Sequence, residues 1–415
     1  MNALLRVFQP QTPALRVQQV LRLLAGFQLL LMLSTLPLWL NDGRFPAVPL
    51  FSVPALPPRL LAMVSAAFAF GCLLLVLKSP AAAPDASARR FPLLPCWLLL
   101  FGILAGCCNQ HCLQAWHVFF LWIVFSGLIR DPQRQLAALR HLPACVYVCS
   151  GLSRLSLEPE AGPTGMILGQ LTAWLPASLQ PAAATFRLLC HAAAWSEVAV
   201  GLLLLSRGRL GGWATAAAML LHAALLLALG PFGLNHNPAV LLWNLCFLCM
   251  LPLLCGRPNR LPAPPRAWVC LLWGISLAGL VGITDNWPSW QLYSSRPENW
   301  QLWIDRQYTS RLPPKLARAT SSTAVDGLVP VRLDLASLQQ TGSPLYPEDR
   351  FQLALIEHTL AQLPEACRFR VRIDQPQVWC WWRRTVRQIS DRRALQAEHN
   401  RFWLNSGERS TAAIH

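Results

Sequence analysis

Long apolar segments recur along this chain, and they constrain its fold more than any other feature of the sequence. A helix needs roughly 20 predominantly apolar residues to cross the hydrocarbon core of a bilayer. Of all residues 54% are apolar and only 13% are charged, whereas soluble domains carry about 25% charged residues. We therefore predict a mainly α-helical, polytopic transmembrane bundle of nine spans, at 20–40, 60–77, 92–108, 112–129, 141–156, 184–206, 213–230, 238–255 and 267–283.

The charged residues divide the chain near Thr284 into two parts of different composition. Residues 1–284 contain 18 Lys or Arg and only six acidic residues, whereas residues 285–415 contain 17 Lys or Arg and 13 acidic residues. The first part is predicted to be the multi-pass membrane domain, and the second an extramembrane domain. Within the first part, the prolines around 163–180 indicate a re-entrant or interfacial segment.

Basic residues are present in some loops and absent from others, and this pattern predicts the orientation of the chain. By the positive-inside rule the N-terminus is cytoplasmic, and an odd number of spans places the C-terminal domain on the extracytoplasmic side of the cell membrane. The net charge of +16 follows largely from these loop arginines, so it does not indicate nucleic acid as a partner. Basic residues lie in the loops at 78–91, 130–140, 207–212 and 256–266, and none lie at 109–111 or 231–237.

The C-terminal domain is predicted to be a small α+β unit. Residues 327–335 and 368–373 alternate between apolar and polar side chains, as strands with one wet face do, and residues 347–363 are typical of an amphipathic helix. The arginines at 383–393 are interpreted as a solvated helix face, with contact to anionic lipid head groups as the alternative.

Aromatic residues and cysteines of this second part carry two further expectations. Trp287, Trp290 and Trp300 suit an aromatic belt at the outer membrane interface. Cys367 and Cys380 could form a disulfide in an oxidising compartment. No spacing of His and Cys residues in the sequence indicates a metal site.

Ionisable residues inside the apolar segments are the leading candidates for function. Glu197 is the only acidic residue among the first 284 that falls inside a predicted span, and His222 lies near mid-membrane on the next span. A charge at the bilayer centre costs roughly 2.5–3.5 kcal/mol on insertion scales. Two interpretations stay open: a functional centre, or a buried hydrogen bond that clamps two helices. We expect Glu197 to pair with His222, with Arg154 as the second candidate partner.

The predicted orientation brings other polar residues to the same outer side. His111 lies in one outer loop, Asn235, His236 and Asn237 lie in another, and Arg154 lies at the outer end of its span. These residues could line one cavity that opens to the outer side. Taken alone, His111 could equally be an interfacial residue or part of a helix cap.

Three stretches resemble the HTTM membrane-domain family, which is shared with vitamin K-dependent γ-glutamyl carboxylase. NQHCLQAWHVFFLWIVFSG is similar to the family's Asn-x-His segment and the apolar helix after it, and YVCSGLSRLS resembles its Tyr-x-x-Ala-Gly-x-Lys-Lys-Leu segment. SEVAVGLLLLSRGRLGGWATAAAMLLHAALLLALGPFG is similar to its acid-bearing helix, basic loop and His-bearing helix. The resemblance covers residues 20–255 and does not extend to the C-terminal domain.

This resemblance implies a pocket for a lipid quinone on the outer side of the membrane domain. Arg154 stands where the family has the lysine that serves as the active base, and arginine does not release its proton. The departure argues against carboxylation itself. By the resemblance and the burial argument, the candidate catalytic residues are Glu197, His222, His111 and Arg154, and the candidate cofactor-binding residues are Tyr147, Asn235, His236 and Asn237.

Two classes of function follow from these observations. The first is a quinone-linked membrane enzyme, an oxidoreductase or a carboxylase-like lyase, that works in the bilayer on a quinone or another lipid-soluble ligand. The second is a non-catalytic membrane scaffold or assembly factor that acts through its outer domain. A transporter is not favoured, because the sequence shows no internal repeat and no pair of broken helices.

Overall fold

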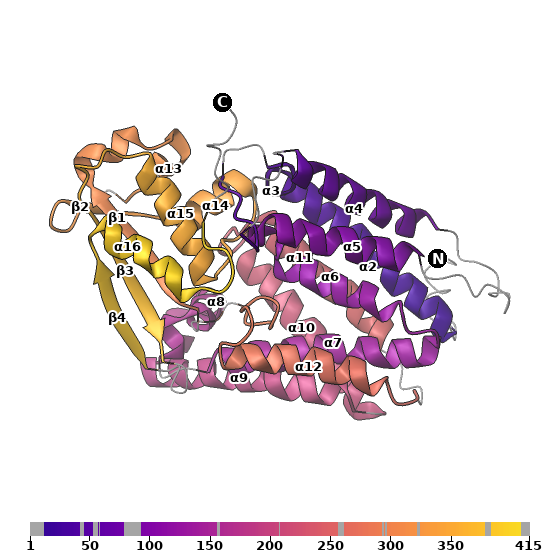
Figure 1. The fold of residues 1–415 in the computed structure, drawn as a ribbon. Coiled ribbons are helices and arrows are strands. Elements are labelled where there is room, and N and C mark those ends of the chain that lie inside the picture. The colour runs from indigo at the N-terminus through magenta and orange to yellow at the C-terminus, as the bar shows by residue number, and fades with distance from the viewer. Residues whose placement is uncertain are drawn as a thin grey trace.

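The computed structural model is a long helical bundle with a small sheet domain at one end (Figure 1). The elements before residue 284 are helical, and the strands all lie after it. The structure describes residues 12–41, 45–52, 57, 59–78, 93–155, 158–206, 208–255, 261–292, 294, 297–321, 324–377 and 383–407.

The bundle is mainly helical, and several of its helices are suited to a bilayer. Among the described residues, five helices are long and apolar enough to cross a membrane, namely α2, α4, α9, α10 and α11, while α5, α6 and α12 are shorter apolar helices. The elements are α2 (Pro13–Ser34), α3 (Leu36–Leu40), α4 (Leu60–Leu77), α5 (Leu93–Cys108), η1 (Gln110–Cys112), α6 (Ala115–Ser126), α7 (Pro132–Ser153), η2 (Pro159–Ala161), α8 (Pro163–Thr172), η3 (Ala177–Leu179), α9 (Ala183–Leu204), α10 (Arg209–Leu229), α11 (Pro238–Cys255) and α12 (Arg266–Leu280).

Helix α7 is the central helix of the bundle, although it is the least apolar of the long ones. It packs against α9, α12, α2, α6 and α11, and its residues from 135 to 151 are almost all buried. A helix that is surrounded by protein needs no lipid-facing apolar surface, which explains its polar composition. A Cβ added at Gly151 would lie 2.7 Å from the Ala194 oxygen, and one at Gly201 would lie 2.8 Å from the Ala144 oxygen. These two glycines allow α7 and α9 to approach closely.

The connections at one end of the bundle contact the sheet domain. The Gln110 side chain in η1 donates a hydrogen bond to the Asn405 carbonyl oxygen at 2.7 Å. Ser294, after α12, donates to the Ser153 carbonyl oxygen at the end of α7 at 2.9 Å. Phe45 and Val48, between α3 and α4, belong to the hydrophobic core of the sheet domain. The bundle and the sheet domain are therefore joined by many segments besides the one covalent link after α12.

The sheet domain contains one four-stranded antiparallel sheet with the order β2-β1-β3-β4. On the central strand, Leu302 lies opposite Val331 on one side and Val371 on the other. Helix α15 packs against β1 and contributes Phe351, which is fully buried, to the core. The elements are β1 (Asn299–Asp305), η4 (Arg306–Arg311), α13 (Pro314–Arg318), β2 (Leu328–Val331), α14 (Leu333–Thr341), α15 (Asp349–Ala361), β3 (Phe369–Pro376), β4 (Arg384–Ile389), α16 (Arg392–Ala397) and η5 (Glu398–Arg401).

Part of the sequence prediction for this domain is confirmed and part is wrong. The helix expected at 347–363 is α15, and the strand expected at 368–373 is β3. The strand expected at 327–335 ends at Val331, because α14 begins at Leu333. The arginines at 383–393 were expected on a helix, but most of this stretch is the edge strand β4, which pairs with β3. A tertiary partner decided the conformation of that stretch, and its local sequence did not.

The tryptophans expected in a membrane belt lie mostly inside the protein. Trp290 is fully buried and belongs to the core of the bundle, and Trp300 is buried in β1, a strand that the sequence analysis missed. Trp287 packs its ring against Tyr346 of the sheet domain, with 5.5 Å between the centroids. Cys380 lies outside the described residues, so its disulfide with Cys367 stays a prediction.

Candidate functional site

The Arg154 guanidinium and the Glu197 carboxylate form a buried ion pair between α7 and α9. Their side chains are only 10% and 6% exposed. Arg154 caps the C-terminus of α7, and it also donates to the Ser150 hydroxyl at 2.9 Å and to the Leu292 carbonyl oxygen at 3.3 Å. Every charged group of this pair therefore has a partner.

The sequence analysis ranked His222 above Arg154 as the partner of Glu197, and the structure reverses this order. Glu197 pairs with Arg154, whereas His222 bonds to Asn244. The cause is the close packing of α7 on α9 at their glycines, which brings the end of α7 within reach of the carboxylate.

The hydrogen bonds of His222 define the tautomer of its buried ring. Its Nδ1 lies 2.9 Å from the Asn244 Oδ1, and the Asn244 Nδ2 donates to the Val240 carbonyl oxygen at 2.8 Å. Because that amide nitrogen is used as a donor, Oδ1 accepts and the His222 Nδ1 carries the proton. The neutral ring then presents a bare lone pair at Nε2, and this atom has no partner among the described residues.

Tyr147 provides a second buried polar atom without a partner among the described residues. Its ring lies 5.8 Å from the His222 ring. The Tyr147 hydroxyl is buried and makes no hydrogen bond to a described residue. We call Tyr147, Arg154, Glu197, His222 and Asn244 the polar centre.

The two unpaired polar atoms of this centre lower the free energy of unfolding. A buried donor or acceptor that lacks a partner costs about 1–3 kcal/mol. The Tyr147 hydroxyl can donate, and the His222 Nε2 can accept, so together they match a ligand that has both a carbonyl and a hydroxyl group. Phe247 packs its ring 4.6 Å from the His222 ring and leaves the surroundings apolar and aromatic.

An aromatic cavity of about 260 Å³ lies between the bundle and the sheet domain, and the residues that line it do not include those of the polar centre. Two of its residues connect it to the centre: Trp243 precedes Asn244 on α11, and Leu292 accepts the hydrogen bond from Arg154. Small-molecule sites are typically concave and mostly apolar, with a few polar groups that fix orientation. The residues that line this cavity include Gln114, Trp116, His236, Trp243, Trp287 and Leu292.

The loop between α10 and α11 places one of its three candidate residues in this cavity. His236 lines the cavity, and its Nδ1 accepts a hydrogen bond from the Asn237 backbone at 2.9 Å. The Asn237 side chain accepts from the Ala239 backbone at 2.8 Å and thereby caps α11. Asn235 adopts a left-handed conformation with φ of 47°, which turns the chain between α10 and α11. Two of the three residues therefore shape the loop.

His111 lies at the interface between η1 and the sheet domain and is not among the residues that line the aromatic cavity. Its Nε2 lies 3.0 Å from the Pro344 carbonyl oxygen and 3.2 Å from the Ser343 hydroxyl. Phe45 and Phe351 flank its ring, each with 5.2 Å between centroids. Burial lowers the pKa of His111 to about 4, so the ring is neutral and stabilises the interface.

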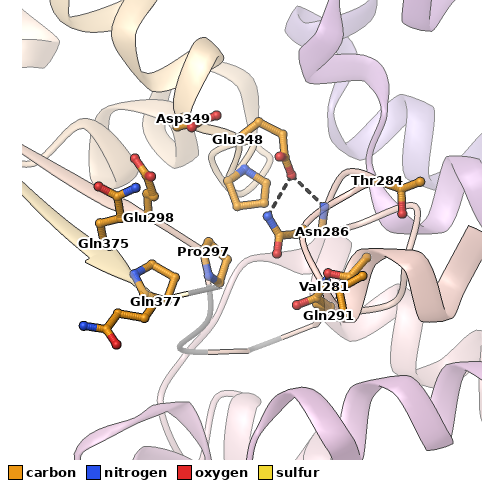
Figure 2. Close-up of a pocket in the computed structure, with 14 residues that line it drawn as sticks. Val281, Thr284, Asn286, Gln291, Pro297, Glu298, Glu348, Asp349, Gln375 and Gln377 are labelled. Atoms are coloured by element: carbon orange, nitrogen blue, oxygen red, sulfur yellow. Dashed lines mark hydrogen bonds between the residues drawn. The ribbon is translucent and has the colours of Figure 1, made fainter. Parts of the chain in front are cut away.

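Asp285 and Arg350 form a second, partly buried ion pair, which the sequence analysis did not identify. Arg350 donates to both Asp285 oxygens, at 2.8 and 2.5 Å, and Tyr346 donates to Asp285 at 2.5 Å. Beside it, Glu348 accepts two hydrogen bonds from Asn286 (Figure 2). Burial and the neighbouring Asp285 raise the pKa of Glu348 to about 8. The available signal was an acidic residue placed directly after the last apolar segment.

Glu348 also lines a polar cavity of about 230 Å³ between the end of α12 and the sheet domain (Figure 2). Glu298 and Asp349 lie around the same cavity, and burial is the main cause that raises the pKa of each. Within the described part of the chain, no group of three or more His, Cys, Asp or Glu residues is arranged to hold a metal ion.

Comparisons with known proteins find no match: no family model, no curated protein and no solved structure is similar to this chain.

Proposed function

We propose that this protein is a multi-pass membrane protein that binds a lipid-soluble quinone or quinol, and that the polar centre handles the quinol proton. The observation that carries the proposal is the pair of unpartnered buried atoms, the Tyr147 hydroxyl and the His222 Nε2. They lie on rings 5.8 Å apart. Phe247 links them to the aromatic cavity, because its ring packs 4.6 Å from the His222 ring and 4.8 Å from the ring of Trp243, which lines the cavity. A quinol hydroxyl can donate to the His222 Nε2, and a quinone carbonyl can accept from Tyr147.

The arrangement supports proton transfer as the chemical step of a quinone-linked enzyme. The bare Nε2 of His222 can accept the proton of a quinol hydroxyl, which leaves a phenolate on the ligand and an imidazolium on the protein. The Arg154 guanidinium belongs to the same polar centre and attracts the phenolate, and its paired Glu197 offsets part of that charge. Arg154 itself is held by Glu197 and does not release its proton, so we propose no carboxylation.

Nine spans with a cytoplasmic N-terminus form the second part of the proposal. The eight apolar helices and the enclosed α7 supply the spans. The connections after α3, α5, α7 and α12 contact the sheet domain or lie beside it, which supports a common outer side. The resemblance to the HTTM family, noted on residues 20–255, agrees with a quinone site on that side.

Quinone binding is tested with purified protein and a short-chain ubiquinone analogue. We expect the analogue to raise the thermal unfolding temperature and to quench tryptophan fluorescence, because Trp116 and Trp243 line the cavity. Tyr147→Phe removes only the unpartnered hydroxyl and should weaken binding by about tenfold, as expected for the loss of one buried hydrogen bond. Tyr308→Phe in the sheet domain is the matched control. Unchanged affinity in Tyr147→Phe, or equal weakening by both variants, would refute the proposed site.

His222→Gln is the second test variant, because glutamine can keep a bond to Asn244 but offers no basic ring nitrogen. The quinone analogue should still bind, whereas the bound quinol should no longer lose its proton to the protein. A bound phenolate absorbs at longer ultraviolet wavelengths than a neutral quinol, so the difference absorption spectrum of the complex measures this transfer. A phenolate band of equal size in the variant and the wild type would exclude His222 as the acceptor.

A further inference from the structure

A cavity of about 260 Å³ lies near the end of the bundle that is opposite to the sheet domain. It is lined by Arg140 and His141 of α7, by Leu205 after α9, and by residues 261–264 before α12. Arg140 precedes Arg154 by 14 positions, which is about 21 Å along the helix. This cavity is therefore separate from the polar centre, and nothing in the quinone proposal uses it.

Arg140 brings a buried positive charge to this cavity. One terminal nitrogen of its guanidinium donates to the Leu204 and Ser206 carbonyl oxygens, at 2.9 and 3.3 Å, and so caps the C-terminus of α9. Its Nε has no partner, and no described carboxylate forms an ion pair with it, although the residue is only 9% exposed. A buried charge without a counter-charge is costly, so an anion in the cavity would be stabilising.

His141 adds a hydrogen-bond donor to the same wall. Its Nδ1 accepts a hydrogen bond from the Trp273 indole at 3.3 Å. A neutral ring that accepts at Nδ1 carries its proton at Nε2, so the remaining nitrogen of this cavity-lining side chain is a donor. The cavity thus combines a guanidinium and an imidazole N–H, and none of the described residues that line it is acidic.

The rest of the lining is apolar and lies close to the lipid-facing surface. Leu205, Leu261 and the Pro262-Ala263-Pro264 stretch complete the wall. Nearby, Leu202 of α9 and Trp213 of α10 are 55% and 74% exposed, as expected of side chains that contact lipid. A ligand that fits must therefore carry a negative charge at one end and apolar chains at the other.

We propose that this cavity binds the phosphate of an anionic phospholipid from the leaflet on the side opposite to the sheet domain. The Arg140 guanidinium and the His141 Nε2–H donate to the phosphate oxygens, and the acyl chains run along Leu205 and Leu261. Basic pockets between membrane helices are suited to anionic head groups in this way. The bound lipid would tie together α7, α9 and the segment before α12.

Native mass spectrometry of the full-length protein tests the assignment. The protein is released from nanodiscs that contain equal amounts of phosphatidylglycerol and phosphatidylcholine. We expect phosphatidylglycerol to be retained about fivefold more than phosphatidylcholine, because each basic residue near the surface favours anionic lipid by about that factor. Equal retention of the two lipids would overturn the proposal. Inorganic phosphate is the second probe, and stabilisation by phosphate without retention of phosphatidylglycerol would overturn the lipid assignment.

Three variants separate the site from general electrostatics and from folding. His141→Phe removes the donor but keeps the Arg140 cap on α9, and Leu261→Trp fills the cavity without changing charge. His141→Phe should reduce the preference for phosphatidylglycerol, and Leu261→Trp should abolish it, in protein that still folds. Arg134→Gln is the control, since Arg134 lies on the same helix with 61% of its side chain exposed, and it should retain the preference. A preference that survives in both site variants, or is lost in the control, would overturn the proposal.

Discussion

Replacing Glu197 by alanine should destabilise the protein strongly, because the Arg154 charge would remain buried without its carboxylate. Both side chains are at least 90% buried, and breaking a buried ion pair from one side costs roughly 3–5 kcal/mol. The Ser150 hydroxyl and the Leu292 carbonyl oxygen still accept from Arg154 in the variant, so we expect the lower end, about 3 kcal/mol. Glu197→Gln keeps an acceptor oxygen for Arg154 and should cost less.

A double-mutant cycle gives the sharper result. Arg154→Met with Glu197→Met removes both charges and leaves side chains of similar volume, and replacing a buried ion pair in this way is often neutral or stabilising. The double variant should therefore be more stable than either single variant, with a coupling energy of about 2 kcal/mol or more. This expectation depends on burial, since an exposed pair contributes about 0–1 kcal/mol.

Thermal unfolding can be followed with a maleimide dye that becomes fluorescent on reaction with thiols. Cys145 and Cys149 of α7 are fully buried and become reactive when the bundle opens. Glu160→Ala is the control, because Glu160 pairs with Arg187 at the surface, where the arginine side chain is 58% exposed. If Glu197→Ala unfolds at the same temperature as Glu160→Ala, or if the double variant is as unstable as the two singles combined, the burial argument fails.

Three further predictions concern topology, packing and pH. A C-terminal alkaline phosphatase fusion should be active and a C-terminal fluorescent protein fusion dark; the reverse pattern would overturn the proposed orientation. Gly201→Ala should lower stability by roughly 1–3 kcal/mol through overpacking, because its Cβ would lie 2.8 Å from the Ala144 oxygen. Gly212→Ala has open space on helix α10 and should leave stability unchanged or raise it by up to about 1 kcal/mol in the same dye assay, because alanine is the better helix former. The pKa of Glu348 in the folded protein is raised to about 8, so its contribution to stability is complete at acidic pH and is lost as pH rises towards 8. The unfolding temperature should therefore fall between pH 5 and pH 8, and this fall should be smaller in Glu348→Gln.

The sequence alone predicted those helices and strands whose side chains are arranged by their preference for water or for an apolar environment. The apolar segments predicted long apolar helices, with bounds close to those of α4, α5, α9 and α11, because a side chain's affinity for lipid is its own property. Alternation predicted β3, and the amphipathic pattern predicted α15. The prolines near 163–180 predicted a re-entrant or interfacial segment, which stays a prediction; the structure has the short α8 and η3 there.

Partners that are distant in sequence were decided by the tertiary structure. The sequence identified Glu197 and His222 as residues whose burial needs a reason, but helix rotation and the close packing of α7 on α9 determined that Arg154 takes the carboxylate and Asn244 takes the imidazole. His111 is a second example. The sequence predicted it in an outer loop, but it is buried because residues 337–351 fold over it.

The edge strand β4 of the sheet domain also depends on a partner that is distant in sequence. A run of arginines is compatible with a helix or a strand, and only the hydrogen bonds to β3 make it a strand. The sequence by itself determined which segments avoid water and which residues are costly to bury. The tertiary structure decided which of those residues meet, because contacts depend on the rotation and spacing of helices that the linear order does not contain.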